Sequence, residues 1–375
     1  MRIQQLYMRH LWSGIVINDV KFSRLNVLVG VSGAGKTTII SALKTLVRVA
    51  EGNPASGLEW SITFLDDLGR KIVWAGKTSK KMEITPQGVG ARIIEEQLTI
   101  DDKSVIDSSE QGLFYNGSKL PKLDDMKSLF SHLKNETEIK SIHASLSSSI
   151  IIDVDSLDFS PSHRTLINKE NYIEEISSFK RNFDIKKFSY QHREIGCKEK
   201  IYYAHEFDKD AFNDFQDTYI SIFNQVRRIE PRIVRTMEAA SAEAHRMLMI
   251  NLELVNGNKV SQSKISSGMF KTMMILAELY FGSNNSPIII DEIENSLGVN
   301  CLPEILSQLN EAENQVIITS HHPRVINEIP VRFWNIVSRK PDGSVVTQAA
   351  ESILPSGRHE AFIQLLNSPE YRGLV

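Results

Sequence analysis

The stretch Leu25 to Thr38, LNVLVGVSGAGKTT, holds the residues with the clearest chemistry in the 375-residue chain. It fits the pattern G-x-x-x-x-G-K-[ST], in which a glycine-rich loop faces nucleotide phosphates with consecutive backbone N–H groups. Lys36 would reach the β and γ phosphates, and Thr37 would bind Mg2+. A glycine-rich turn that binds nothing is the alternative, but the flanking apolar runs favour a phosphate loop. Its residues are Gly30, Val31, Ser32, Gly33, Ala34, Gly35, Lys36, Thr37 and Thr38.

Two adjacent carboxylates follow a second apolar run, Pro287 to Ile290. A short buried strand there would place Asp291 and Glu292 at its carboxyl end, the edge of an open α/β sheet at which ligands bind. Asp291 would then hold the Mg2+ through water, and Glu292 would orient or deprotonate the water that attacks ATP. Taken alone, an Asp-Glu pair after an apolar run is more often a solvated strand end.

A segment with two serines and a glycine, ISSGM, comes directly before an apolar run that predicts a helix over Phe270 to Phe281. Serine hydroxyls at the start of a helix satisfy its free backbone N–H groups, so the segment is equally compatible with a simple cap. The residues of interest are Ser266, Ser267 and Gly268.

A last apolar run, Val316 to Thr319, ends in Ser320 and His321. We expect a buried strand that delivers polar groups to the same edge of the sheet. A lone histidine after a strand is most often a structural turn residue. His321 is a candidate site residue only because it follows Asp291 by about thirty residues.

The order and spacing of these four motifs are typical of one class of nucleotide hydrolase. In FSRLNVLVGVSGAGKTTII, ISSGM, IIIDEIENSL, VIITSHHP and the late FWNIVSRKPDGSV, the chain resembles the ABC-type ATPase heads of the SMC-like and OLD-like class. The resemblance covers about residues 1–155 and 250–350. Within the class the chain looks most like the stand-alone AAA-type ATPases of bacterial antiviral systems of the Septu, Gabija and PARIS types.

The resemblance implies an ATPase, slow and regulatory, that forms a homodimer or a higher even oligomer around ATP. In that class Ser266, Ser267 and Gly268 of one subunit would close over the γ-phosphate held by another. His321 matches the switch histidine, which contacts the γ-phosphate. The antiviral ATPases assemble with or carry a nuclease or another toxic effector, so the implied partner is an effector protein. Two alternatives use the same pocket: an SMC-like DNA-repair or chromosome ATPase that clamps DNA, and an ATP-binding scaffold with little turnover.

The composition is that of an ordinary globular protein, with 41% hydrophobic and 24% charged residues. A net charge of −3 argues against binding nucleic acid by charge alone, although it leaves a local basic face open. Cys197 and Cys301 match neither a zinc pattern nor a disulfide framework. The N-terminus lacks the apolar core of a signal peptide, and no run is long enough to cross a bilayer. We therefore expect a cytoplasmic protein without a membrane partner.

The elements expected along the chain indicate an α/β fold. The resemblance implies a P-loop NTPase of ABC type, with a mixed sheet, flanking helices, an antiparallel β meander and an inserted helical subdomain. We expect strands within 1–30, at 150–154, 288–291, 316–319, 333–339 and 344–348, the meander at 57–115, and helices at 37–48, 126–149, 302–309 and 358–367. The expected domains are an N-terminal lobe at 1–155, a mainly helical insert at 156–250, a C-terminal lobe at 251–350 and a helix and tail at 351–375.

The charge-rich insert is the least regular part of the sequence. We expect strands near 185–190 and 200–207, and helices at 169–181, 210–228 and 231–249. Arg228, Arg232 and Arg235 recur at helical spacing, which would suit contacts with DNA or RNA phosphates. A solvated helix face with acidic neighbours such as Glu230 is the preferred interpretation.

Overall fold

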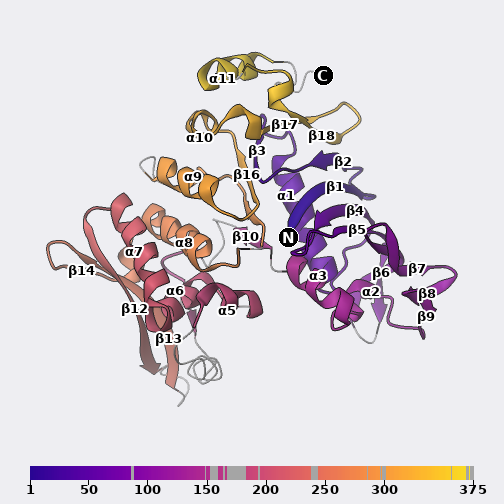
Figure 1. Cartoon of the computed structure of the whole chain (residues 1–375), viewed down its shortest axis with the longest axis horizontal. Helices are drawn as coiled ribbons and strands as arrows, with labels where there is room; N and C mark the ends of the chain where they lie inside the picture. Colours follow the sequence, from indigo (N-terminus) through magenta and orange to yellow (C-terminus); the bar gives the residue numbers. More distant parts are fainter. Residues whose placement is uncertain are drawn as a thin grey trace. The chain divides into compact units, whose positions relative to one another are not determined.

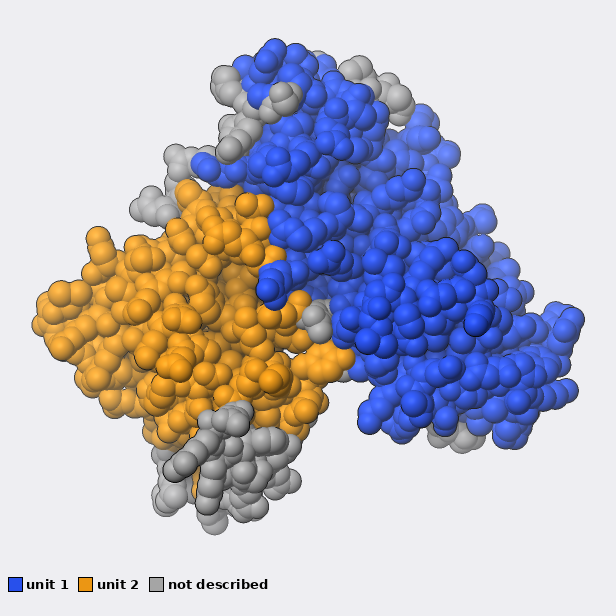
Figure 2. All heavy atoms as spheres, in the orientation of Figure 1, with its two compact units in different colours: residues 1–151, 285–292, 313–375 blue, residues 152–284, 293–312 orange. Residues whose placement is uncertain are grey.

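The computed structural model divides the chain into two compact units, which Figure 1 labels by element and Figure 2 colours separately. Unit 1 comprises Met1–Ile151, Asn285–Glu292 and Glu313–Val375, and unit 2 comprises Ile152–Asn284 and Ile293–Ala312. The structure describes residues 1–85, 88–147, 149–152, 159–163, 165–166, 183–192, 195–237, 244–284, 286–295, 297, 301–355, 357–368 and 371. Among these residues, no helix has the length and apolar character that crossing a bilayer requires.

Unit 1 is a mixed α/β structure, as the sequence predicts. Its helices are α1 (Lys36–Ala50), α2 (Leu129–His132), α3 (Thr137–Ser147), α10 (Pro323–Glu328) and α11 (Arg358–Asn367). Its strands are β1 (Arg2–His10), β2 (Val16–Lys21), β3 (Leu25–Val29), β4 (Leu58–Leu65), β5 (Lys71–Thr85), β6 (Gly88–Ile100), β7 (Lys103–Ser109), β8 (Gly112–Tyr115), β9 (Ser118–Lys119), β10 (Ile150–Ile152), β15 (Ile288–Ile290), β16 (Val316–Ser320), β17 (Trp334–Arg339) and β18 (Ser344–Ala349). The expected meander is β4 to β8, and the single helix expected at 126–149 is instead divided into α2 and α3.

One sheet joins these strands in the order β10-β15-β16-β3-β17-β18-β2-β1-β4-β5-β6-β7-β8-β9. Strand β3 lies between β16 and β17 and is parallel to both, and β15 is parallel to β16. All five residues of β3 are buried, which suits a central strand covered on both faces. The carboxyl ends of β3, β15, β16 and β17 therefore meet at one edge of the sheet.

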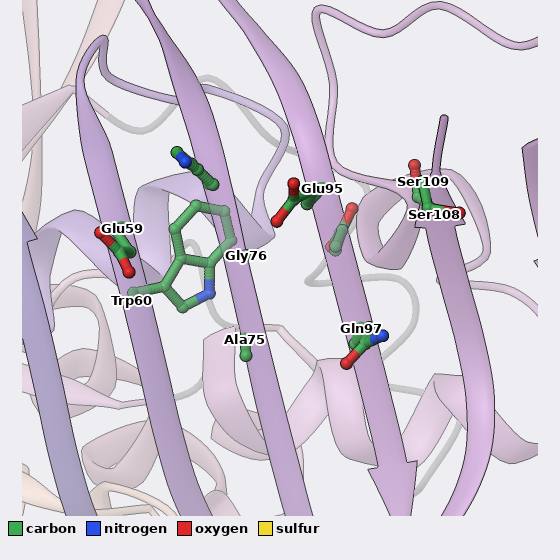
Figure 3. A pocket seen from close by; sticks show the side chains of 10 residues that line it. Glu59, Trp60, Ala75, Gly76, Glu95, Gln97, Ser108 and Ser109 are labelled. Carbon is green, nitrogen blue, oxygen red and sulfur yellow. The ribbon is translucent and has the colours of Figure 1, made fainter. Parts of the chain in front are cut away.

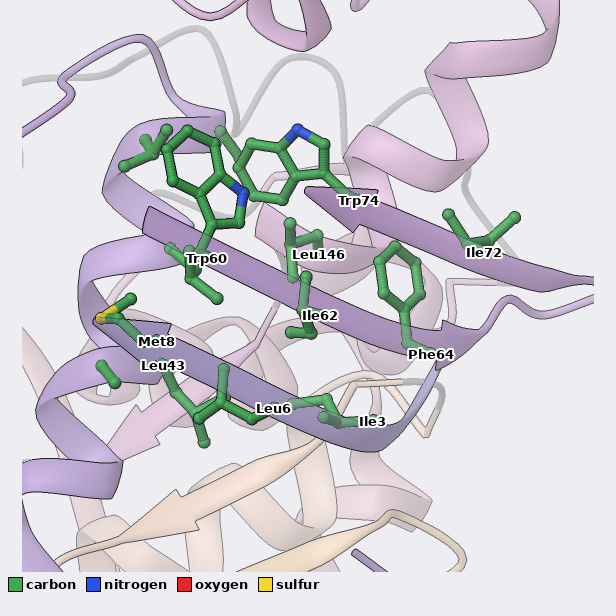
Figure 4. Close-up of a cluster of buried hydrophobic side chains, with 14 of the residues drawn as sticks. Ile3, Leu6, Met8, Leu43, Trp60, Ile62, Phe64, Ile72, Trp74 and Leu146 are labelled. Atoms are coloured by element: carbon green, nitrogen blue, oxygen red, sulfur yellow. The ribbon is translucent and has the colours of Figure 1, made fainter. Parts of the chain in front are cut away.

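The core of unit 1 lies between the first strands of the sheet and its helices. Alternate residues of β1, β4 and β5 point to the same side, and Figure 4 shows Leu6, Ile62 and Trp74 gathered there with Leu43 of α1 and Leu146 of α3. Each of these side chains is at most 3% exposed. This packing fixes α1, which follows the phosphate loop, against the sheet.

A pocket of about 290 Å³ opens among strands β4 to β7 (Figure 3). Its lining residues are Glu59, Trp60, Ala75, Gly76, Lys77, Glu95, Glu96, Gln97, Ser108 and Ser109. Glu96 is fully buried and accepts hydrogen bonds at Oε1 from Trp74 Nε1 (2.9 Å) and Ser128 Oγ (2.6 Å), and at Oε2 from Leu129 N (2.6 Å). The carboxylate thus ties the start of α2 to β6, and burial raises the pKa of Glu96 although these bonds oppose the rise.

The raised pKa of Glu96 predicts a pH-dependent contribution to stability. Because the folded pKa lies above the ordinary value of 4.5, this contribution is complete below pH 4.5 and is lost as the pH rises through the folded pKa. Even the protonated carboxyl keeps an oxygen with lone pairs at both ends, whereas the amide nitrogen of Glu96→Gln cannot accept, so we expect the substitution to lower the free energy of unfolding by about 1–3 kcal/mol at acidic pH. The deficit should shrink as the pH rises.

Urea unfolding at several pH values, followed by tryptophan fluorescence, measures this difference. The matched control is Glu95→Gln, because Glu95 is the exposed neighbour of Glu96 on β6. A deficit that does not change with pH, or that changes equally in the control, would contradict the role given to Glu96.

Unit 2 combines helices with a small sheet. Its helices are α5 (Ile185–Gln191), α6 (Cys197–Phe207), α7 (Lys209–Ile222), α8 (Ser267–Phe281) and α9 (Leu302–Glu311). Its strands are β11 (Thr165–Leu166), β12 (Val226–Met237), β13 (Ala244–Leu254) and β14 (Lys259–Val260), with the order β11-β13-β12 and β14 paired to β13.

Several expectations for this region are wrong. Segments 185–190 and 200–207 belong to helices α5 and α6. Asp184 caps α5 by accepting hydrogen bonds from Lys186 N (3.0 Å) and Lys187 N (3.1 Å). The helices expected over 210–228 and 231–249 give way to the hairpin β12–β13 after α7 ends at Ile222. Pro231 fits there because β12 is an edge strand, which tolerates a missing N–H. The helix expected at 169–181 lies outside the described residues.

The arginines of β12 form an ion-pair network with buried carboxylates. Glu230 pairs with Arg228 (2.5 Å), Arg232 (2.6 Å) and Lys259 (3.2 Å), and Glu253 also pairs with Arg228 (2.8 Å). Burial alone would raise the pKa of Glu230, but the hydrogen bond from Lys259 and the nearby arginines lower it. The helix face expected here is wrong, because the arginines lie on a strand, but the acidic neighbour Glu230 expected beside them is confirmed.

Helix α8 is held in unit 2 by a buried polar cluster. Glu278 of α8 accepts hydrogen bonds from Lys200 Nζ (2.7 Å) and Cys197 Sγ (2.7 Å), both on α6. Burial alone would lower the pKa of Lys200, but the Glu278 carboxylate and Cys197 outweigh it and the pKa is raised. Removing one member of such a pair leaves a buried charge, so the cluster fixes the position of α8 on α6.

Candidate functional site

The phosphate loop follows β3 and leads into α1, as the sequence predicts. Its glycines meet steric and conformational demands that a side chain would violate. A Cβ on Gly30 would lie 2.5 Å from the carbonyl oxygen of Val337, and one on Gly35 would lie 2.6 Å from a methyl of Val345. Gly35 also has φ of +109°, in the left-handed region. The loop therefore packs directly on β17 and β18.

The start of α1 presents backbone N–H groups and a cation. The N-cap is Gly35, which has no side chain that could cap the helix. Lys36 is 6% exposed and its Nζ donates to the carbonyl oxygens of Gly30 (2.6 Å) and Val31 (3.1 Å). An uncapped helix N-terminus beside an ammonium group favours anions, because the helix dipole and the lysine both carry positive charge there.

Asp291 and Glu292 follow β15 at the same edge of the sheet. Asp291 Oδ1 lies 3.5 Å from Thr37 Oγ1 of α1 and accepts a hydrogen bond from Thr319 Oγ1 at 2.5 Å. The backbone N–H of Glu292 donates to the same Thr319 oxygen at 2.7 Å. One buried hydroxyl at the end of β16 thus connects both acidic residues.

Glu292 has an unusual backbone conformation. Its φ is +46°, within the left-handed region, which costs a residue other than glycine about 1–3 kcal/mol. Such strain persists only where neighbouring contacts enforce it, and here the hydrogen bond to Thr319 is one of them. The contacts that enforce this backbone conformation therefore also fix the direction in which the Glu292 side chain leaves the backbone.

His321 and Arg339 complete this edge of unit 1. His321 is exposed and is the first residue after β16, as expected from the sequence. Arg339 ends β17, and its Nε donates to the carbonyl oxygen of Gly33 at 3.3 Å. Neither Arg339 nor Thr319 is marked in the sequence, because an arginine or threonine at the end of an apolar strand carries no local signal.

The segment Ser266 to Gly268 lies in unit 2, at the start of α8. Ser266 is the N-cap, and its hydroxyl accepts from Met269 N at 3.3 Å, so the expected cap is confirmed. Ser267 is exposed in the first turn and Gly268 is half-buried. A cap and a phosphate-binding helix start are compatible, because Ser266 uses only one of the first backbone N–H groups.

Solved structures with the same fold are heads of SMC proteins. One is the SmcHead bound to the C-winged helix domain of ScpA, with a TM-score of 0.52 and 14% identity over 94% of this chain and 99% of that chain. Another is the Smc head domain with an extended coiled coil bound to the C-terminal domain of ScpA, derived from Pyrococcus furiosus, with a TM-score of 0.50 and 13% identity over 98% and 100%. At this identity the likeness establishes the fold alone.

Comparison with known sequences gives the family. No curated protein matches the chain. Residues 25–327 match the family described as "AAA domain, putative AbiEii toxin, Type IV TA system". The match begins at β3, spans well over half of the chain, and includes the phosphate loop, Asp291 and His321. The chain therefore belongs to this family of AAA-type P-loop ATPases, and it has the fold of SMC heads.

Proposed function

We propose that this protein binds and slowly hydrolyses ATP in the cytoplasm, dimerises around ATP, and thereby regulates an effector such as a nuclease or toxin in bacterial antiviral defence. The observation that carries the ATPase proposal is the approach of Thr37 Oγ1 to within 3.5 Å of Asp291 Oδ1. This approach brings the phosphate loop close to the carboxylate that follows β15. In this proposal residues 1–155 and 251–350 form the ATPase head, 156–250 are an insert, and 351–375 are a helix and tail.

The donor atoms at this edge suit magnesium. Mg2+ prefers oxygen ligands and often keeps several waters beside one or two protein groups. Thr37 and Asp291 offer a hydroxyl and a carboxylate oxygen on neighbouring elements. Bound there, Mg2+ would neutralise charge on the β and γ phosphates.

The remaining roles follow from charge and position. The N–H groups of the loop and the Lys36 ammonium would hold the phosphates, which are the most highly charged part of ATP. Glu292, directed by its left-handed backbone, would accept a proton from the attacking water or orient it. His321, exposed at the end of β16, would contact the γ-phosphate.

The dimer is proposed from the exposed start of α8. Ser267 and Gly268 would bind the γ-phosphate held by a second copy, so each site takes its loop from one subunit and its serine from the other. Each of the two solved heads described above is bound to a domain of ScpA, which supports a head that recruits a protein partner. The family description names a toxin of a type IV TA system, which supports an effector of that kind.

Complementation between two inactive variants tests the shared site. Ser267→Arg should block the contact with the second subunit, and Lys36→Ala should empty the loop, so each alone should lower turnover by about 100-fold. When equal amounts of the two variants combine at random, half of the dimers contain one copy of each variant. In each of these dimers one of the two sites is intact. Phosphate release should therefore return to about a quarter of the wild-type rate.

Ser307→Arg is the matched control, because Ser307 is an exposed serine on a helix of the same unit. It should keep full turnover alone. If the mixture stays as inactive as its components while both variants fold, the site is not shared between subunits. If Ser267→Arg alone is fully active, α8 does not take part in the ATPase site.

A further inference from the structure

We infer that Thr319 is a positioning residue for ATP hydrolysis, which sets the metal-binding acid and the proposed base at the same time. The inference rests on the proposed function and adds to it a residue outside the phosphate loop, the acidic pair and the histidine. Thr319 is fully buried in β16, so it touches neither phosphate nor metal directly. Its effect has to pass through Asp291 and Glu292.

The hydroxyl of Thr319 makes two hydrogen bonds, donating in one and accepting in the other. It has one hydrogen to donate, and it donates that hydrogen to Asp291 Oδ1 at 2.5 Å. Its oxygen accepts the backbone N–H of Glu292 at 2.7 Å. Because a hydroxyl carries both a donor and acceptor lone pairs, only serine among the common small residues can repeat both bonds.

The bond to Asp291 acts on metal binding. The same oxygen, Oδ1, faces Thr37 Oγ1 at 3.5 Å, so the Thr319 hydroxyl sets the direction of the carboxylate on the side that meets α1. Hydrogen bonds of this kind orient ligating groups, and their loss typically lowers metal affinity or activity by about 10–100-fold. Thr319 therefore contributes to the Mg2+ requirement of nucleotide binding.

The bond to Glu292 acts on the proposed base. It holds the N–H of a residue whose φ of +46° is strained, and without it the backbone is free to leave the left-handed region. The carboxylate would move with the backbone. Thr319 also sits two residues before His321, so β16 links the base and the metal-binding acid to the position of the histidine.

Two substitutions separate the hydroxyl from the methyl group. Thr319→Val keeps the shape and removes both hydrogen bonds, whereas Thr319→Ser keeps both. We expect Thr319→Val to raise the Mg2+ concentration needed for half-maximal binding of a fluorescent ATP analogue by about tenfold, and to lower turnover by about 10–100-fold. The residual binding of the analogue in EDTA should equal that of the wild-type protein, and Thr319→Ser should stay within about twofold of wild type in every measurement.

Thr78→Val is the matched control. Thr78 is also a fully buried threonine of the unit 1 sheet, and its hydroxyl also donates once, to Ala55 O (2.8 Å), and accepts once, from Leu58 N (2.8 Å). It should lower the melting temperature as Thr319→Val does and leave the Mg2+ dependence at the wild-type value.

The outcomes distinguish the inference from the function on which it rests. Wild-type protein that binds no ATP analogue with or without Mg2+ would overturn the proposed function. Wild-type binding that requires Mg2+, together with an unchanged Mg2+ midpoint in Thr319→Val, overturns the inference alone. A Thr319→Ser variant as impaired as Thr319→Val, or a Thr78→Val variant with the same Mg2+ shift, also overturns it.

Discussion

Glu292→Gln is expected to lower the steady-state rate of ATP hydrolysis by about 10³-fold while ATP binding is preserved. Glutamine has the size of glutamate but cannot take a proton from water. The hydrogen bond from the Glu292 backbone N–H to Thr319 Oγ1 does not depend on the side chain, so the substitution should leave the local backbone in place. The hydrogen bond from Thr319 Oγ1 to Asp291 Oδ1 is also untouched.

A variant that binds ATP without hydrolysing it should accumulate in the ATP-bound state. If that state is a dimer, light scattering after size exclusion should give a stable dimer for Glu292→Gln with ATP and Mg2+. The wild-type protein should return to its nucleotide-free state as ATP is consumed. Phosphate release, binding of the fluorescent analogue and particle mass are the three measurements.

Glu294→Gln provides the comparison, because Glu294 is the next acid along the chain and has no assigned role. We expect this variant to hydrolyse ATP at nearly the wild-type rate. Parental turnover in Glu292→Gln would remove Glu292 as the base. Loss of turnover in Glu294→Gln instead would move that role two residues along the chain.

The ATP-bound state expected for Glu292→Gln also bears on the proposed effector. If effector release requires hydrolysis, a partner that co-purifies with the wild-type protein should remain bound in this variant. If release occurs with ATP binding alone, the protein acts as a scaffold with little turnover. The same preparation therefore separates the main proposal from this alternative.

The parts of the fold that carry the motifs could be predicted because each is determined locally. Strand β3, the glycine loop and α1 follow from an apolar run, the glycines and an apolar helix within about thirty residues. The apolar strands β15 and β16 were expected for the same reason. The glycines at 30 and 35 also agree with the packing, since a Cβ at either position would meet β17 or β18.

The secondary structure expected for unit 2 is wrong where the sequence fits both the periodicity of a helix and that of a strand. Arg228 and Arg232 are four residues apart, which suggests a helix, but the intervening Ile229, Glu230 and Pro231 belong to a strand. Charged Arg228, Glu230 and Arg232 alternate with apolar residues at period two, and pairing with β13 determines the result. Tertiary pairing of this kind overrides local propensity. The helix signals that were missed are Asp184, which caps α5, and Glu199, whose carboxylate accepts a hydrogen bond from Gly196 N at the start of α6.

Two features of the candidate site had no signal in the sequence. Thr319 lies in an apolar run, where a threonine is ordinarily a strand residue with a buried methyl group. The left-handed backbone of Glu292 is equally hidden, because glutamate shows no preference for positive φ. Both depend on β15 and β16 lying side by side, which brings residues 28 positions apart into hydrogen-bonding distance.

Lys36→Ala is expected to abolish nucleotide binding. The Lys36 ammonium is held at the mouth of the loop by the carbonyl oxygens of Gly30 and Val31 and would meet the β and γ phosphates there. Charge-assisted hydrogen bonds to phosphate contribute about 3 kcal/mol, so affinity for the fluorescent ATP analogue should fall by about 100-fold or more. Fluorescence titration measures the loss directly.

The two roles of Lys36 have to be separated, since the same ammonium also braces the loop. Lys36→Met keeps most of the length of the side chain and removes its charge, so it should lose nucleotide binding as Lys36→Ala does. Lys44→Ala removes a lysine two turns further along α1 and should bind the analogue like wild type. If Lys36→Met binds within about threefold of wild type, the ammonium does not contact phosphate and serves only the loop, because a lost charge-assisted bond would cost far more.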